Sequence, residues 1–94
     1  MKFRIEDRAE AEIWQATEHY ESCRPGLGEE FGLELEAAFQ QILAHPLAWP
    51  KLDDILRRCQ VRRFPYAVIY RVRPREIQIL VVMHLHRRPG YWRS

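Results

Sequence analysis

The spacing of apolar residues changes once along the chain, from a helical period to a strand-like one. Between residues 7 and 45 apolar side chains recur at steps of three and four, whereas from residue 57 they alternate with polar ones. The first spacing places side chains on one face of an α-helix, and the second places them on one face of a β-strand. The pattern therefore predicts a helical first half and a sheet-forming second half.

The helical half predicts two helices that form an antiparallel hairpin. The first apolar stripe is Ala9, Ile13, Ala16 and Tyr20, widened by Trp14, and the second is Phe31, Leu35, Ala38 and Ile42. Residues 24–28 (Arg-Pro-Gly-Leu-Gly) cannot continue a helix, and His45 with Pro46 ends the second one. Because the connection is so short, the two helices are expected to lie side by side.

The second half predicts three strands over residues 57–62, 66–72 and 77–86, and residues 3–5 predict a short strand ahead of the helices. Three consecutive strands on short turns form an antiparallel meander. The last strand is apolar on both sides, which is typical of a central strand covered on both faces. In its expected alternation one side holds Ile77, Ile79, Val81, Met83 and Leu85, and the other holds Leu80 and Val82.

These elements predict an α+β fold, a small antiparallel β-sheet in the order β-α-α-β-β-β with the helical hairpin packed on one face. The length of 94 residues suits a single domain over residues 1–94. The connection over residues 46–50 carries Trp49, which we expect to be exposed. A hydrophobic share of 47% argues against disorder.

Composition also argues against a membrane-spanning or secreted protein. No apolar run approaches the roughly 18 residues that a membrane helix needs, and the acidic residues near the N-terminus do not suit a secretory signal. The two cysteines, Cys23 and Cys59, are too few for a disulfide framework. We therefore expect a cytoplasmic protein without membrane contact.

The net charge of +2 hides a strong asymmetry between the two halves. Residues 1–56 carry 5 basic and 12 acidic side chains, whereas residues 57–94 carry 10 arginines and a single acid, Glu76. Arginine presents a planar fork of donors that suits phosphate or carboxylate. Pairing with the acids of the first half is an alternative, but exposed ion pairs of this kind contribute little each. We therefore expect the second half to present a cationic surface to an anionic partner.

Residues after the last predicted strand, His86, Arg87 and Tyr91, allow two interpretations. One is metal-free RNA cleavage, in which one group takes the 2′-hydroxyl proton, another protonates the leaving oxygen and guanidinium neutralises the phosphorane. The other, favoured by the residue types, is an anion-binding patch. His84 and His86 share one strand face but lack a third metal ligand, so no metal or cofactor is expected.

The basic tail over residues 87–94 carries Tyr91 and Trp92. These rings either stack on nucleic-acid bases or fold back onto the sheet. Because Pro89 and Gly90 reverse the chain, we favour the second arrangement.

Four short motifs occur in a specific order. They are Arg24-Pro25-Gly26-Leu27-Gly28 before Phe31; Ile42-Leu43 before Pro46; Arg63-Phe64-Pro65-Tyr66 before Val68-Ile69-Tyr70; and the closing His84, Arg87, Pro89, Tyr91 and Trp92. Together they resemble the ParE/RelE superfamily, the toxin halves of type II toxin–antitoxin pairs. The resemblance covers nearly the whole chain and implies the fold that the hydrophobic pattern predicts.

The superfamily has two functional branches: DNA gyrase inhibitors that resemble ParE, and ribosome-dependent mRNA endonucleases that resemble RelE. The RelE-like branch typically carries a basic residue where this chain has Ala67, and the closing motif looks more like ParE. The resemblance therefore implies a toxin that inhibits gyrase by binding. Its expected contacts with the target or its nucleic acid are Arg87, Arg88, Tyr91, Trp92 and Arg93.

Two alternatives stay open. In an mRNA endonuclease, His86 would transfer protons, Arg63 and Arg87 would clamp the phosphate, and Tyr91 would stack on a base or transfer a proton. In an inactive orphan relative, only the fold would be retained.

The resemblance also implies a cognate antitoxin, ParD-like or similar, whose acidic and flexible C-terminal segment wraps the toxin. Such a segment would complement the arginine-rich strands and the groove of the helical hairpin. Antitoxin contacts are therefore expected at Arg62, Arg71, Trp14 and Leu35. Neutralisation should weaken as the salt concentration rises.

Overall fold

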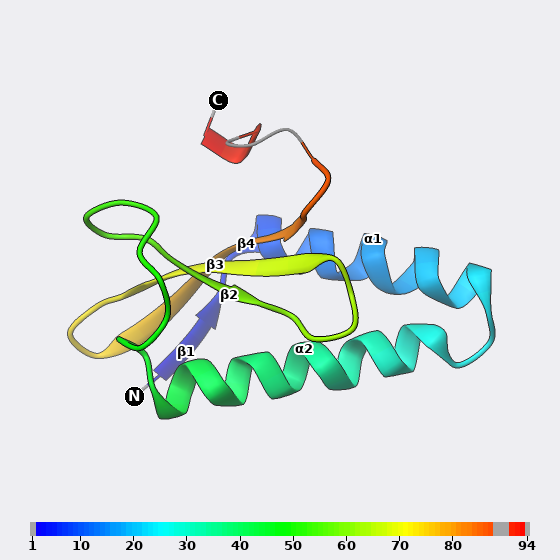
Figure 1. Ribbon diagram of the computed structural model, residues 1–94, viewed down its shortest axis with the longest axis horizontal. Helices are drawn as coiled ribbons and strands as arrows, with labels where there is room; N and C mark the ends of the chain where they lie inside the picture. The colour runs from blue at the N-terminus through cyan, green and yellow to red at the C-terminus, as the bar shows by residue number, and fades with distance from the viewer. Residues whose placement is uncertain (1, 88–90, 94) are drawn as a thin grey trace.

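The computed structural model describes residues 2–87 and 91–93. Its elements are strand β1 (Lys2–Ile5), helices α1 (Asp7–Cys23) and α2 (Leu27–Ala44), strands β2 (Arg57–Gln60), β3 (Tyr66–Val72) and β4 (Glu76–His84), and the short 3₁₀ helix η1 (Tyr91–Arg93) (Figure 1). The α+β fold class and the order β-α-α-β-β-β are therefore confirmed. Within the described part of the chain, neither helix has the length and apolarity to cross a bilayer.

The sheet has the strand order β1-β4-β3-β2 and is mixed. Strands β2, β3 and β4 form the predicted antiparallel meander, whereas β1 pairs in parallel with β4. The antiparallel helices return the chain to the end where β1 begins (Figure 1), so β1 and β2 run in the same direction. Because the meander then reverses the chain twice, β4 runs parallel to β1.

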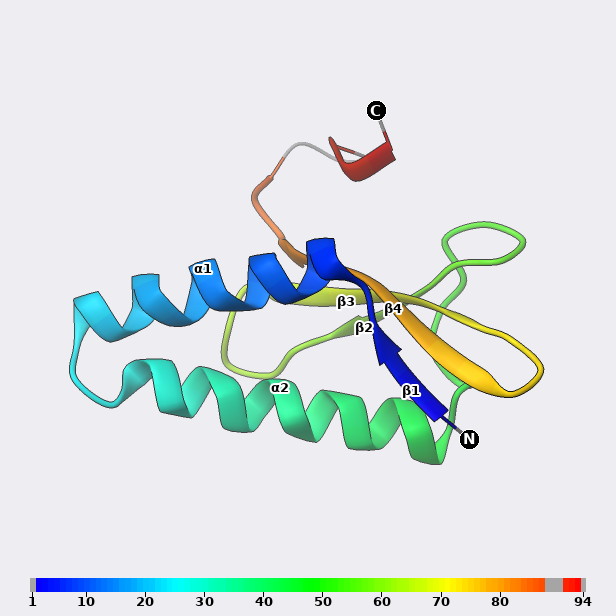
Figure 2. The same ribbon diagram turned by 180° about the vertical axis from the view of Figure 1, so that it is seen from behind.

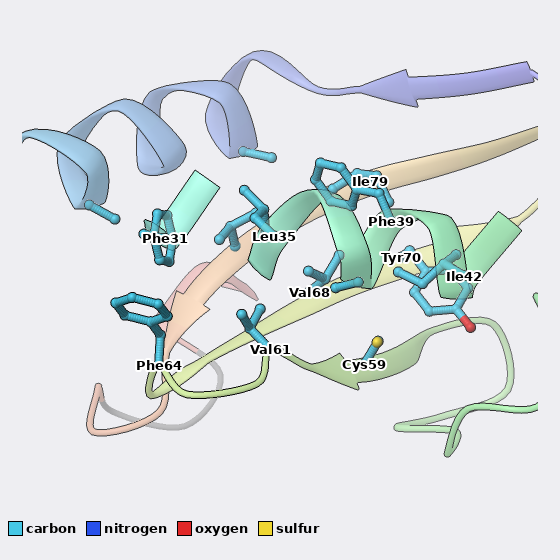
Figure 3. Close-up of a cluster of buried hydrophobic side chains, with 14 of the residues drawn as sticks. Phe31, Leu35, Phe39, Ile42, Cys59, Val61, Phe64, Val68, Tyr70 and Ile79 are labelled. Carbon is cyan, nitrogen blue, oxygen red and sulfur yellow. The ribbon is translucent and has the colours of Figure 1, made fainter. Parts of the chain in front are cut away.

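The main hydrophobic core lies between the helical hairpin and one face of the sheet. Helices α1 and α2 lie side by side along this face (Figures 1 and 2). The core includes Phe31, Leu35 and Ile42 from α2, Val68 and Tyr70 from β3, and Ile79 from β4 (Figure 3). The predicted stripe of α2 is thus buried. The stripe of α1 is narrower than predicted, because Trp14 is 62% exposed.

The opposite face of the sheet carries a smaller cluster of Leu56, Ile69 and Val81, against which Tyr91 and Trp92 of η1 pack. The prediction that the aromatic tail folds back onto the sheet is therefore confirmed, and the central strand β4 is covered on both faces. Figure 2 shows α2 and η1 on opposite sides of the sheet.

The predicted alternation of β4 is wrong beyond Ile79. Ile69 pairs with Val81 and Tyr70 pairs with Ile79, which leaves Leu80 as an extra residue in a β-bulge. As a result Val81 joins the smaller cluster, on the face opposite to Ile79, while Val82 joins the main core.

The turn between the helices requires both of its glycines. Gly26 has a φ of +90°, and a Cβ at Gly28 would lie 2.8 Å from the carbonyl oxygen of Thr17. The Glu21 carboxylate accepts hydrogen bonds from the backbone N–H groups of Gly26 at 3.0 Å and Gly28 at 3.1 Å. These contacts bring the start of α2 against the end of α1.

The connection from α2 to β2, residues 45–56, differs from the prediction in its exposed residues. Trp49 is half-buried and packs against the main core rather than standing in solvent. The large hydrophobic residues exposed here are instead Leu47 (66%), Leu52 (42%) and Ile55 (63%). The Tyr70 hydroxyl donates a 2.7 Å hydrogen bond to the carbonyl oxygen of Pro46 and so ties the connection to the sheet.

Candidate functional site

Most of the described arginines of the second half have no carboxylate partner among the described residues. The structure describes the side chains of eight of the ten, and among these eight only Arg63 forms an ion pair with a carboxylate. Arg57 donates to the backbone carbonyls of Leu47 and Trp49, and Arg71 donates through Nε to Gln78 at 2.6 Å. Neutral acceptors leave the guanidinium charge in place, so this surface is available to an anionic partner.

Arg63 is the exception because the β2–β3 connection brings it to α2. Its guanidinium lies 2.7 Å from Glu30 and 3.5 Å from Glu34. Hydrogen bonds from Arg63 and Arg24 lower the pKa of the Glu30 carboxyl below its ordinary value. The charge of Arg63 is therefore paired with two carboxylates of α2.

A second group of residues, charged and aromatic, forms the C-terminal cluster and consists of Arg8, Glu12, Arg87, Tyr91 and Trp92. Its centre is Glu12 of α1, whose carboxylate accepts hydrogen bonds from the Val82 backbone N–H at 3.0 Å and the Tyr91 hydroxyl at 2.6 Å. Strand β1 pairs with β4 only as far as Ile79, so Glu12 takes the place of a strand partner at Val82. One carboxylate thus joins α1, β4 and η1.

Two arginines flank the Tyr91 ring and complete the cluster. The guanidinium carbons of Arg87 and Arg8 lie 4.1 and 5.4 Å from the ring centroid. Arg8 also donates to the Trp92 carbonyl oxygen at 2.9 Å. These contacts hold η1 on the sheet while Arg87 stays exposed, so the cluster can present a cation beside an ordered aromatic ring.

The Tyr91 hydroxyl is held in its protonated form. Burial, together with the hydrogen bond to Glu12, raises the pKa of Tyr91 to about 12. The cluster borders a small cavity of about 110 Å³ that is also lined by Gln15, Tyr66 and His84. A phenol with so high a pKa donates hydrogen bonds at neutral pH but does not act as a base.

The histidine pair lies at the end of β4. His84 is the last residue of the strand and His86 follows it in a turn, with 5.0 Å between the ring centroids. The His84 ring also lies edge-on to Tyr66, and its Nδ1 accepts the His86 backbone N–H at 3.1 Å. Burial, with the nearby His86 and Arg87, lowers the pKa of His84. Among residues 2–87 and 91–93, no group of three His, Cys, Asp or Glu side chains is placed to hold a metal ion.

The candidate nuclease residues are only partly brought together. Arg87 and Tyr91 are in contact, and His86 lies beside His84 next to them. Arg63, in contrast, is paired with α2 and does not line the cavity beside Tyr91. Of the candidate target contacts, Arg88 lies outside the described residues, and Arg93 is the last residue of η1.

The four candidate antitoxin contacts occupy four different environments. Arg62 is exposed and borders a groove of about 290 Å³ between α2 and β2, whereas Arg71 lies on β3 and contacts Gln78. Trp14 is exposed on α1. Leu35 is only 3% exposed and belongs to the main core. A buried core residue does not offer a binding surface, so the expectation that Leu35 contacts an antitoxin is wrong.

The sequence prediction missed Arg8 and Glu12 as parts of the site. Both belong to an ordinary solvated helix face in the sequence, and their partners Tyr91 and Trp92 are about eighty residues away. No local signal joins them. The exposed Leu47 and Ile55 were also missed, because the local sequence does not distinguish them from Trp49 and Leu56 of the same connection, which are half-buried and buried.

The fold and the site together define a class: a small α+β protein that exposes an arginine-rich sheet and fastens a basic, aromatic C-terminal segment to it. A family model described as "ParE toxin of type II toxin-antitoxin system, parDE" matches residues 3–89. The chain therefore belongs to the ParE toxin family, and the resemblance seen in its motifs is confirmed.

The solved structures include a similar chain, described as "Chromosomal ParDE TA system from P. aeruginosa". The match has a TM-score of 0.72 and 22% sequence identity, and it covers 92% of this chain and 97% of that one. At this level of identity the likeness supports the fold alone. No curated protein matches the sequence.

Proposed function

We propose that this chain is a cytoplasmic toxin that inhibits DNA gyrase by binding it, and that a cognate antitoxin neutralises it. Residues 1–94 would act as a single toxin domain without a cofactor. The observation that carries the proposal is the cationic surface on which, among the described arginines of the second half, only Arg63 pairs with a carboxylate, with Arg87 exposed beside the ordered Tyr91. A surface of this kind suits binding to a protein–DNA complex, which offers both carboxylates and phosphates.

Binding accounts for the described contacts better than RNA cleavage does. The Tyr91 hydroxyl already donates to Glu12, and its pKa of about 12 keeps the proton in place at neutral pH. The guanidinium of Arg63 is held by Glu30 and Glu34 rather than aimed at the C-terminal cluster. Proton transfer by Tyr91 and a phosphate clamp by Arg63 would both require these contacts to break.

A supercoiling assay tests the target. The purified chain is expected to inhibit gyrase, and Arg87→Glu is expected to weaken inhibition by about tenfold or more because it reverses a charge at the interface. Lys2→Glu makes the same charge change at the far end of the sheet and should leave inhibition nearly unchanged. Cleavage of ribosome-bound mRNA by the purified chain, with gyrase unaffected, would refute the proposal.

The antitoxin is proposed to be a ParD-like protein whose acidic C-terminal segment contacts Arg62, Arg71 and Trp14. Arg62→Glu is expected to weaken antitoxin binding by about tenfold at low salt, and the affinity of the unmodified chain should fall as salt rises. Isothermal titration calorimetry over a salt series measures both effects, with Lys2→Glu on the opposite edge strand as the control. An affinity that does not change with salt would contradict the charge argument.

A further inference from the structure

The last two turns of α1 place an imidazole and a thiol side by side. His19 and Cys23 lie four residues apart, a spacing that puts both side chains on the same face of a helix. Both residues are exposed, and the Nε2 of His19 lies 3.8 Å from the Sγ of Cys23. Among the described residues, neither atom has another hydrogen-bond partner. The pair therefore presents two metal-ligating atoms to the outside of the chain.

The separation of these two atoms matches a tetrahedral zinc site. Zinc binds thiolate sulfur at about 2.3 Å and imidazole nitrogen at about 2.0–2.1 Å. At the tetrahedral angle, these bond lengths put the two ligand atoms about 3.6 Å apart. The observed 3.8 Å corresponds to an angle of about 120° at the ion, so both atoms can bind one ion without a rearrangement of the helix.

The electrostatic surroundings of the pair favour a cation. The last turn of α1 carries no basic residue, so no side chain of that turn offsets the partial negative charge at this helix end. Arg24 follows the helix, but its guanidinium lies 3.0 Å from the Glu30 carboxylate and is paired there. Glu18 and Glu21, in the same two turns, are exposed acids. A divalent ion held by the pair would therefore be stabilised by its surroundings.

The other candidate metal ligands of the chain are less well placed. Cys59 is 2% exposed and belongs to the main core. The Nδ1 of His84 already accepts the backbone N–H of His86, and the cationic Arg87 follows directly in the chain. A neighbouring guanidinium opposes the binding of a second cation. The exposed pair on α1 is therefore the place that a metal ion would occupy first.

A single chain supplies only two of the four ligands that zinc takes in a structural site. Among residues 2–87 and 91–93, no third His, Cys, Asp or Glu side chain completes a group with the pair. The turn between α1 and α2 extends beyond the sheet (Figures 1 and 2), so this end of α1 is open to a second molecule. Two copies related by a twofold axis, the commonest symmetry of protein oligomers, would bring two thiolates and two imidazoles to one ion.

We propose that two copies of this chain share one Zn²⁺ ion, which is bound by His19 and Cys23 of each copy. The thiols bind as thiolates, so each releases its proton to solvent as the metal binds, and no oxidation or reduction takes place. The ion would link two chains rather than take part in gyrase inhibition. The site goes beyond the gyrase proposal, because it shares no residue with the C-terminal cluster and its test measures metal and mass.

Zinc titration, followed by calorimetry and by sedimentation velocity, tests the site on the full chain in a reducing buffer. One ion per two chains is expected, with a dimer that forms as zinc is added and dissociates in EDTA. Cys23→Ser and His19→Gln should each weaken zinc binding by more than about a hundredfold, because loss of a residue that only supports a ligand already costs about 10- to 100-fold. Thiolate-bound, tetrahedral Co²⁺ absorbs strongly, and this absorption should be lost in Cys23→Ser.

His45→Gln is the matched control, because it removes an exposed histidine at the end of α2 and should change zinc affinity by less than about twofold. The proposal is overturned by no zinc binding to the folded chain, by one ion per monomer, by a dimer that forms without zinc, or by a loss in His45→Gln or His86→Gln equal to that in Cys23→Ser. Circular dichroism establishes that each variant is folded. A metal-free chain that leaves gyrase active would count against the proposed target but not against the zinc site.

Discussion

Phe31→Ala is expected to destabilise the chain by about 3–5 kcal/mol, the usual cost of replacing a buried phenylalanine by alanine. Phe31 is fully buried, and its ring centroid lies 5.1 Å from Tyr66, 5.3 Å from Phe64 and 5.4 Å from Tyr20. Its ring therefore joins α1, α2 and the start of β3. Removing it would leave a cavity between these three elements.

Urea denaturation measures the free energy of unfolding of this variant. Leu33→Ala on the same helix is the control, because Leu33 is 64% exposed and its loss should cost less than about 0.5 kcal/mol. If both variants lost the same stability, the assignment of the buried face of α2 would be wrong.

Glu12→Ala is expected to release η1 from the sheet and to lower stability by about 1–3 kcal/mol, because it leaves the Val82 N–H and the Tyr91 hydroxyl without their acceptor. Hydrogen exchange should show faster exchange at Val82 and in η1, with little change in α2. Under the proposed function, gyrase inhibition should fall in parallel, because Arg87 would lose the ordered ring on which it stacks.

Two further variants separate the role of this carboxylate from a general effect of charge. Tyr91→Phe keeps the ring but removes the hydroxyl, so a smaller effect confined to η1 is expected. Glu10→Ala removes an exposed carboxylate two residues away on α1 and should leave the Val82 exchange rate unchanged. Slow exchange at Val82 in Glu12→Ala would show that Glu12 does not hold the end of β4.

Much of the fold follows from short-range patterns, because each pattern reports on one element. The stripe from Phe31 to Ile42 lies on the buried side of α2, and the glycines at 26 and 28 mark the turn between the helices. The same stripe does not show which of its residues face the core and which face a partner. Leu35 was compatible with either position, and only the packing of α2 on the sheet shows that its side chain is buried.

The candidate site was less predictable, because its parts come from distant segments. The sequence pointed to Arg87 and Tyr91 but not to Glu12, which meets them only because α1 lies against the end of β4. Contacts between such segments leave no periodic trace in a single sequence.

The amino-acid sequence by itself determined the two helices, the antiparallel meander and the separation of acidic from basic halves, since these depend on periodicity, turn residues and charge. Tertiary structure alone decided the parallel pairing of β1 with β4 and the bulge at Leu80, which turns Val81 to the face of the sheet opposite the helices. It also decided that Arg63 forms an ion pair with Glu30 of α2. Each of these depends on which backbone edges and side chains meet after the helices fold onto the sheet, and that is a property of the assembled layers rather than of any one segment.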